Sequence, residues 1–232
     1  VIKLSNKFWF NMNVLKKSVA EFIGIFFLTF IGGAAIINTN SDLLIVALAH
    51  GLTVALVISS LGHISGAHIN PAVTIGFLIT KKINFKTASS YIFAQTLGSI
   101  FAAICLRNLI PNSMDFDLGG QSLNESIGFF DGLFIEMILT FLLVLSIFGV
   151  AVDHRGPIKH ISGFGIGLVV TIDIFAGGPL TGASMNPART FGPSLISGNW
   201  ENHLLYWIGP IIGGILASLF YDKFFNENSG VK

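Results

Sequence analysis

The chain has 232 residues, of which 52% are hydrophobic and 11% charged, with a formal net charge of +1 and a mean hydropathy of +0.75. A water-soluble core built from so many apolar residues would leave too little polar surface to cover it, which excludes an ordinary soluble domain. The small net charge and the absence of a basic cluster interleaved with aromatic residues exclude nucleic acid as a partner.

Six apolar segments are long enough to cross a membrane, because a hydrocarbon core of roughly 30 Å needs about 20 helical residues. Two shorter apolar segments, 70–79 and 186–196, would reach only about 15 Å as helices, which is half of the membrane. We therefore predict an all-α membrane protein with six transmembrane helices and two re-entrant half-helices. The six predicted crossings are residues 14–37, 43–61, 88–106, 129–152, 161–178 and 204–222.

The distribution of basic residues predicts which end of each segment faces the cytoplasm. Residues 1–17 contain lysines but no short apolar core followed by a small-residue cleavage site, so we expect no removable signal peptide. With both termini cytoplasmic, only Arg107 falls in an outer loop and Arg189 lies within a short segment, while all other basic residues are inside. Those inner residues are Lys3, Lys7, Lys16, Lys17, Lys81, Lys82, Lys86, Arg155, Lys159, Lys223 and Lys232.

The sequence also contains a long internal repeat, with a period of about 115 residues. Residues 66–76 (GAHINPAVTIG) align with residues 182–192 (GASMNPARTFG), and Tyr91 matches Tyr206. We assign repeat 1 to about 14–110 and repeat 2 to about 127–225, within one channel domain that covers residues 1–232. Since each half has an odd number of full crossings, the two halves are predicted to be inverted, and their short segments enter from opposite faces.

Each short segment opens with the same tripeptide, Asn-Pro-Ala. Asparagine is a favoured N-cap and proline is favoured at the first helical position, so each tripeptide predicts a helix start. The asparagine carbonyl can cap the helix while its NH₂ group faces a passing molecule. A single Asn-Pro pair more often marks a turn, but two in matched repeat positions favour a midplane donor site. Its residues are Asn70, Pro71, Ala72, Asn186, Pro187 and Ala188.

These features resemble the major intrinsic protein family, the aquaporins and glycerol facilitators. The resemblance runs from about Val14 to Phe225 and includes both Asn-Pro-Ala boxes, Ala20-Glu21-Phe22 and residues 189–193 (RTFGP). It implies the aquaporin fold, a homotetramer of four separate pores, and a passive channel in the lipid bilayer for water and small neutral solutes that excludes ions and protons. We expect no enzyme activity, because no serine, cysteine or aspartate dyad can be placed at the pore centre, and we expect no cofactor or metal.

The resemblance also locates a selectivity filter at His50, Ile174, Ala183 and Arg189. An arginine there supplies a fixed cation and several donors that replace part of the water shell. Water-specific members usually carry phenylalanine at the place of His50 and histidine at the place of Ile174. The present set is similar to filters of some plant vacuolar members, a class that passes ammonia. A packed structural histidine is the alternative interpretation of His50.

Two carboxylates lie within predicted crossings, where ionisable groups usually mark an ion pathway. The resemblance implies instead that Glu21 and Glu136 brace the re-entrant loops by accepting backbone hydrogen bonds. Asp173, which precedes Ile174, has no assigned role, although it is a candidate to hold the second re-entrant loop. The glycines of residues 163–167 are interpreted as sites of close helix packing.

Other functions are less well supported. A glycerol or urea facilitator is the first alternative, although such members usually carry aspartate after the filter arginine, where this chain has Thr190, and large filter aromatics. A coupled secondary transporter shares inverted repeats and broken helices but needs a coupling-ion site, which two amides and positive helix ends disfavour. The plasma membrane is the expected location.

Overall fold

The structure is a computed structural model that describes residues 6–155 and 161–226. Those ranges contain helices joined by turns and loops, without strands, which confirms the predicted all-α class. Lys3, Lys159 and Lys232, which entered the predicted orientation, lie outside the described residues. The elements are α1 (Asn6–Asn38), α2 (Leu43–Ser65), α3 (Pro71–Ile79), α4 (Phe85–Leu109), η1 (Ser113–Gly119), α5 (Phe129–Ile147), η2 (Phe148–Val152), α6 (Ser162–Thr181), α7 (Pro187–Ser197) and α8 (Leu205–Phe224).

Six of the described helices are long and apolar enough to cross a membrane, as predicted. Several of their ends lie beyond the predicted apolar segments, and the largest differences include the end of α2 at Ser65 and the start of α4 at Phe85. Gly66, with a left-handed φ of 93°, ends α2, while Asn84 caps α4 by accepting a hydrogen bond from the Thr87 N–H at 2.9 Å. Capping residues therefore set these ends, and hydropathy alone placed them too far inside.

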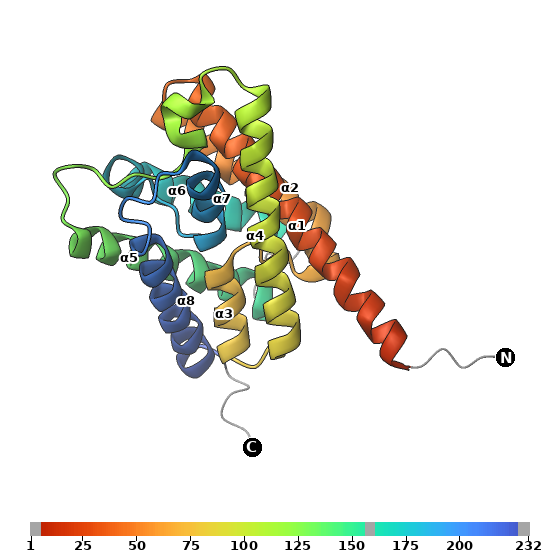
Figure 1. Ribbon diagram of the computed structural model, residues 1–232. Coiled ribbons are helices and arrows are strands. Elements are labelled where there is room, and N and C mark those ends of the chain that lie inside the picture. The colour runs from red at the N-terminus through yellow and green to blue at the C-terminus, as the bar shows by residue number, and fades with distance from the viewer. Residues whose placement is uncertain (1–5, 156–160, 227–232) are drawn as a thin grey trace.

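The two short segments form helices of 9 and 11 residues, α3 and α7. Figure 1 shows them extending in opposite directions from the middle of the molecule, among the long helices. Their N-terminal ends meet, since the Asn70 side-chain amide donates to the Met185 carbonyl at 2.7 Å and the Asn186 amide donates to the Ile69 carbonyl at 2.8 Å. The start of each half-helix is thus hydrogen-bonded to the loop that precedes the other half-helix.

Helices of the two halves approach each other closely at glycines. A Cβ atom on Gly167 of α6 would lie 2.3 Å from the carbonyl oxygen of Gly51 of α2, and one on Gly51 would lie 2.5 Å from that of Gly167. Gly163 likewise abuts Ala55 and Ser59 of α2. The packing interpretation therefore holds for Gly163 and Gly167 but is wrong for Gly165, whose added Cβ would meet nothing within 4 Å. Gly165 lies on the opposite side of α6, because alternate helical residues do not share a face.

Candidate functional site

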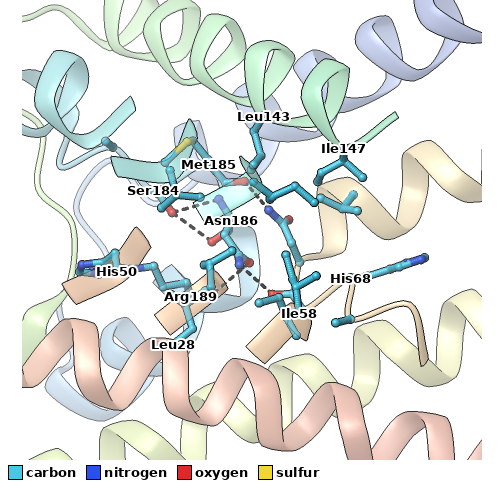
Figure 2. Close-up of a pocket in the computed structure, with 18 of the residues that line it drawn as sticks. Leu28, His50, Ile58, His68, Leu143, Ile147, Ser184, Met185, Asn186 and Arg189 are labelled. Atoms are coloured by element: carbon cyan, nitrogen blue, oxygen red, sulfur yellow. Dashed lines mark hydrogen bonds between the residues drawn. The ribbon is translucent and has the colours of Figure 1, made fainter. Parts of the chain in front are cut away.

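A narrow cavity lies where α3 and α7 meet, and Figure 2 shows the side chains around it. Its volume of about 40 Å³ has room for only a few water molecules. A cavity of about 510 Å³ adjoins it and shares His68 and Ile166, while a cavity of about 380 Å³ shares Ile174. The molecule therefore contains a narrow passage between two wider openings.

Both asparagines of the repeated tripeptides line this narrow passage. The side-chain oxygen of Asn70 accepts a hydrogen bond from the Ala72 N–H at 2.8 Å, and that of Asn186 accepts from the Arg189 N–H at 3.3 Å. These contacts confirm the predicted helix caps. Each NH₂ group carries two hydrogens, and one of them is used in the bond to the other half. The sequence did not reveal this bond, which leaves each amide one N–H for a passing molecule.

The four predicted filter residues lie together, because His50, Ile174, Ala183 and Arg189 all line the same cavity. Nε and Nη2 of Arg189 lie 3.1 and 2.7 Å from Nε2 of His50. Nη1 of Arg189 is enclosed and has no hydrogen-bond partner within the described ranges. His50 thus faces the passage and is also hydrogen-bonded, so its geometry is compatible both with a filter residue and with a packed structural histidine. The arginine retains one donor nitrogen for a passing molecule.

Glu21 and Glu136 make matching contacts in the two halves, and both are fully buried. Glu21 accepts hydrogen bonds from the His68 N–H at 2.9 Å and the Ile69 N–H at 2.5 Å. It also accepts from Ser65 and Gln95 side chains, at 2.7 and 2.8 Å. Both carboxylate oxygens are therefore occupied by donors from the chain itself.

In the second half, Glu136 accepts from the Ser184 N–H at 2.8 Å, the Met185 N–H at 2.6 Å and the Thr181 hydroxyl at 2.8 Å. The loops that these carboxylates hold have unusual backbones, with φ of 43° at Ile69 and 53° at Met185. Residues with side chains rarely adopt positive φ, and β-branched isoleucine least of all. The carboxylate bonds compensate for conformations that would otherwise be costly.

Most of the passage wall is apolar, and sequence reasoning missed it. The wall residues occur in repeat-matched pairs, such as Leu28 with Leu143 and Val54 with Val170. The alignment of the two Asn-Pro-Ala boxes could have found them, because matched positions of inverted repeats face the same central axis. His68 also lines the passage, and its Nδ1 lies 3.2 Å from the Thr74 hydroxyl.

Asp173 does not hold the second re-entrant loop. Its side chain is buried, and Oδ2 has no hydrogen-bond partner in the described part of the chain. It is also absent from the cavity lining, although the adjacent Ile174 is there. We have no physical account of its presence.

Comparison with known proteins shows similarity along nearly the whole chain. The family profile described as Major intrinsic protein matches residues 9–221. Aquaporin TIP4-4 of Zea mays is 42% identical over 193 residues, which cover 83% of this chain and 76% of that protein. Probable aquaporin TIP3-2 of Arabidopsis thaliana is 40% identical, covering 90% of this chain and 83% of the relative. Aquaporin-4 of Rattus norvegicus is 39% identical, covering 90% and 67%.

One solved structure extends the similarity to three dimensions. The X-ray structure of the aquaglyceroporin from Plasmodium falciparum superposes with a TM-score of 0.81 at 28% sequence identity. The matched region covers 91% of this chain and 96% of that chain. The arrangement of the helices is therefore shared over nearly the full length of both proteins.

Proposed function

The chain belongs to the major intrinsic protein family and is an integral membrane channel that passes water passively, and we propose that the same pore passes ammonia and excludes ions and protons. The observation that carries the proposal is the meeting of two half-helix N-termini, each with an asparagine amide, inside a passage with room for only a few water molecules. The pore residues are Asn70, Pro71, Ala72, Asn186, Pro187 and Ala188, and the filter residues are His50, Ile174, Ala183 and Arg189.

Exclusion of protons follows from the two amides. Each has one N–H left for a solute, so a water molecule between them accepts two hydrogen bonds through its oxygen. Its own hydrogens then point away from the centre along the pore axis, and neighbouring water molecules on the two sides cannot form one continuous donor chain. The N-terminal ends of α3 and α7 carry roughly half a positive charge each, which repels cations, including hydronium, at the same point.

Passage of ammonia follows from the filter. The guanidinium of Arg189 opposes cations such as ammonium, and its Nη1 can donate to the lone pair of ammonia or to a water oxygen. Ile174 and Ala183 supply a small apolar wall without further donors or acceptors. This wall returns few of the hydrogen bonds that a solute loses on leaving water, which disfavours ions and strongly hydrated molecules more than small neutral solutes.

The proposal is tested in proteoliposomes that contain a pH-sensitive dye. An inward gradient of ammonium salt at constant osmolarity should alkalinise the interior faster than in protein-free liposomes, since only the neutral base crosses. Equal alkalinisation rates with and without protein, together with fast water flux, would leave a strict water channel and refute the ammonia proposal.

The alternatives predict different fluxes in the same vesicles. A glycerol or urea facilitator would accelerate re-swelling after shrinkage in those solutes. The similarity to an aquaglyceroporin structure makes this the second candidate, while the lack of aromatic side chains at Ile174 and Ala183 argues against it. A coupled transporter would require an ion gradient for solute flux, whereas our proposal requires none.

We further propose a homotetramer in the plasma membrane, with both termini cytoplasmic and one channel domain over residues 1–232. The positions of the basic residues support the orientation, and the matched contacts of Glu21 and Glu136 support two inverted repeats within the domain. Protease accessibility of sealed vesicles tests the orientation, and mass measurement in detergent tests the tetramer.

A further inference from the structure

A second cavity lies apart from the pore, between the start of α1, the end of α3 and the start of α4. Its volume is about 610 Å³, and none of its lining residues lines the central passage. Three of the side chains around it are lysines, Lys17, Lys81 and Lys82, and none is acidic. A volume in this range suits a small ligand or part of a larger one.

The positive charge in this cavity is only partly neutralised by the protein. Nζ of Lys82 pairs with Asp222 at 2.9 Å. Across residues 6–155 and 161–226, neither Lys17 nor Lys81 has an ion-pair partner. Lys81 also has a left-handed φ of 59°, a conformation that glycine adopts more readily. Lys17 and Lys81 thus line a concave site, and no carboxylate in the described residues neutralises their charges.

Neutral donors complete the lining. The side-chain oxygen of Asn84 caps α4, so its NH₂ group is the part of that amide left for another partner. Asn13 and Thr87 contribute an amide and a hydroxyl to the same cavity. The positive N-terminal end of α4, a helix of 25 residues, begins here as well. Lysines, amides and a helix start are groups that bind phosphate in proteins.

The depth of the cavity indicates where such a phosphate comes from. Lys16 and Lys17 stand at the start of the apolar part of α1, and Lys86 stands at the start of α4. Basic residues that flank apolar helices mark the membrane surface, which is where lipid phosphates are found. Leu78 and Ile83 form part of its wall, and the neighbouring Phe85 is 74% exposed. Lysine pockets between transmembrane helices at this depth bind acidic headgroups.

We propose that this cavity binds the phosphate of an anionic lipid, with Lys17 and Lys81 as its charge partners and Asn84 as a hydrogen-bond donor. Compensation of the α3 dipole and the orientation of the chain explain basic residues at this face in general. They do not explain a cavity that gathers lysines without an acidic lining residue. The proposal does not depend on which solutes cross the pore.

The test measures lipid binding to the intact protein in detergent by native mass spectrometry. Phosphatidylglycerol is titrated against phosphatidylcholine, for the wild type and for the double variant Lys17→Gln/Lys81→Gln. The control variant Lys16→Gln/Lys223→Gln removes the same charge from two lysines that do not line the cavity. Unchanged circular dichroism and water permeability establish that both variants are folded.

We expect the wild type to prefer phosphatidylglycerol, and the cavity variant to lose about fivefold in affinity for each lysine, or roughly 25-fold, against less than about twofold for the control. Equal losses in the two variants, or equal binding of the two lipids by the wild type, would overturn the proposal. Inorganic phosphate is added as a competitor at millimolar concentration. No displacement is expected, and complete displacement would overturn the lipid assignment in favour of a soluble phosphate.

Discussion

His50 and Arg189 come from opposite halves of the chain, and Nε2 of His50 lies 2.7 Å from Nη2 of Arg189. The other ring nitrogen of His50 lies 2.8 Å from the Val46 carbonyl oxygen. A carbonyl only accepts, so Nδ1 carries the hydrogen and Nε2 is the acceptor for the guanidinium. The imidazole is therefore neutral in this arrangement, and it fixes the position of Arg189, the only arginine or lysine among the described residues that line the passage.

Replacing His50 by phenylalanine removes this acceptor. We expect the guanidinium of Arg189, with its other donors then unpaired, to project into the lumen and bind passing molecules more tightly. Ammonia permeability should fall about tenfold, which corresponds to about 1.4 kcal/mol or one hydrogen bond, while water still passes. The measurement is the rate of dye alkalinisation in proteoliposomes.

His50→Gln is the matched control, because its amide oxygen can still accept from Arg189. It should retain more ammonia flux than His50→Phe. Unchanged ammonia flux in His50→Phe would mean that the histidine has no part in selecting the solute and serves packing alone.

The second prediction concerns the carboxylate that holds the second re-entrant loop. Glu136→Gln leaves one oxygen for three donors, and its NH₂ group then faces a backbone N–H such as that of Met185. We expect a loss of about 2 kcal/mol and a melting temperature lower by about 4–8 °C. Differential scanning fluorimetry in detergent measures it, with the exposed Glu125→Gln as control. A variant as stable as the wild type would show that the carboxylate does not brace the loop.

The third prediction concerns the contact between α2 and α6. Gly167→Ala places a methyl group 2.3 Å from the Gly51 carbonyl oxygen, which forces the helices apart and should cost about 1–3 kcal/mol. Gly165→Ala, on the same helix, meets nothing within 4 Å and should be neutral or slightly stabilising, because alanine favours a helix over glycine. Equal melting temperatures for the two variants would contradict the packing at Gly167.

The fourth prediction concerns pH and Asp153, which follows the membrane span of α5. Hydrogen bonds from Arg155, the closest at 2.7 Å, and from the Tyr221 hydroxyl at 3.0 Å hold the pKa of Asp153 below its ordinary value of 3.8. Because the pKa is lower in the folded state, the stabilisation is present above about pH 4 and is lost as the pH falls further. Asp153→Asn should therefore melt at a lower temperature than the wild type near pH 7, and the difference should shrink towards pH 3. A difference independent of pH would mean that the carboxylate charge contributes nothing.

Much of the fold could be predicted because the membrane limits what an apolar segment can do. A segment in the hydrocarbon core has no water to bond, so its backbone N–H and C=O groups must form hydrogen bonds within the segment. Long apolar segments therefore become helices. The Asn-Pro signal then marked the starts of α3 and α7, since Asn70 and Asn186 cap the helices through their own side chains. Both are local effects, which a sequence records directly.

Long-range contacts were harder to predict. Nothing local to Asn70 indicates that its amide also bonds to Met185, and nothing near His50 indicates Arg189 as its partner. Gly165 shares its spacing with Gly163 and Gly167 but lies on another face of α6. These relationships depend on how helices are placed in space, which periodicity determines only in part.

We infer that the meeting of α3 and α7 forms a water pore that breaks proton transfer. Its most direct test is stopped-flow light scattering of proteoliposomes under an osmotic gradient at several temperatures, with internal pH recorded under an imposed proton gradient. We predict fast shrinkage with an activation energy close to that of diffusion in bulk water, and no proton leak above that of protein-free liposomes. Water flux no faster than through lipid, or a proton leak that rises with the amount of protein, would show that α3 and α7 do not form such a pore.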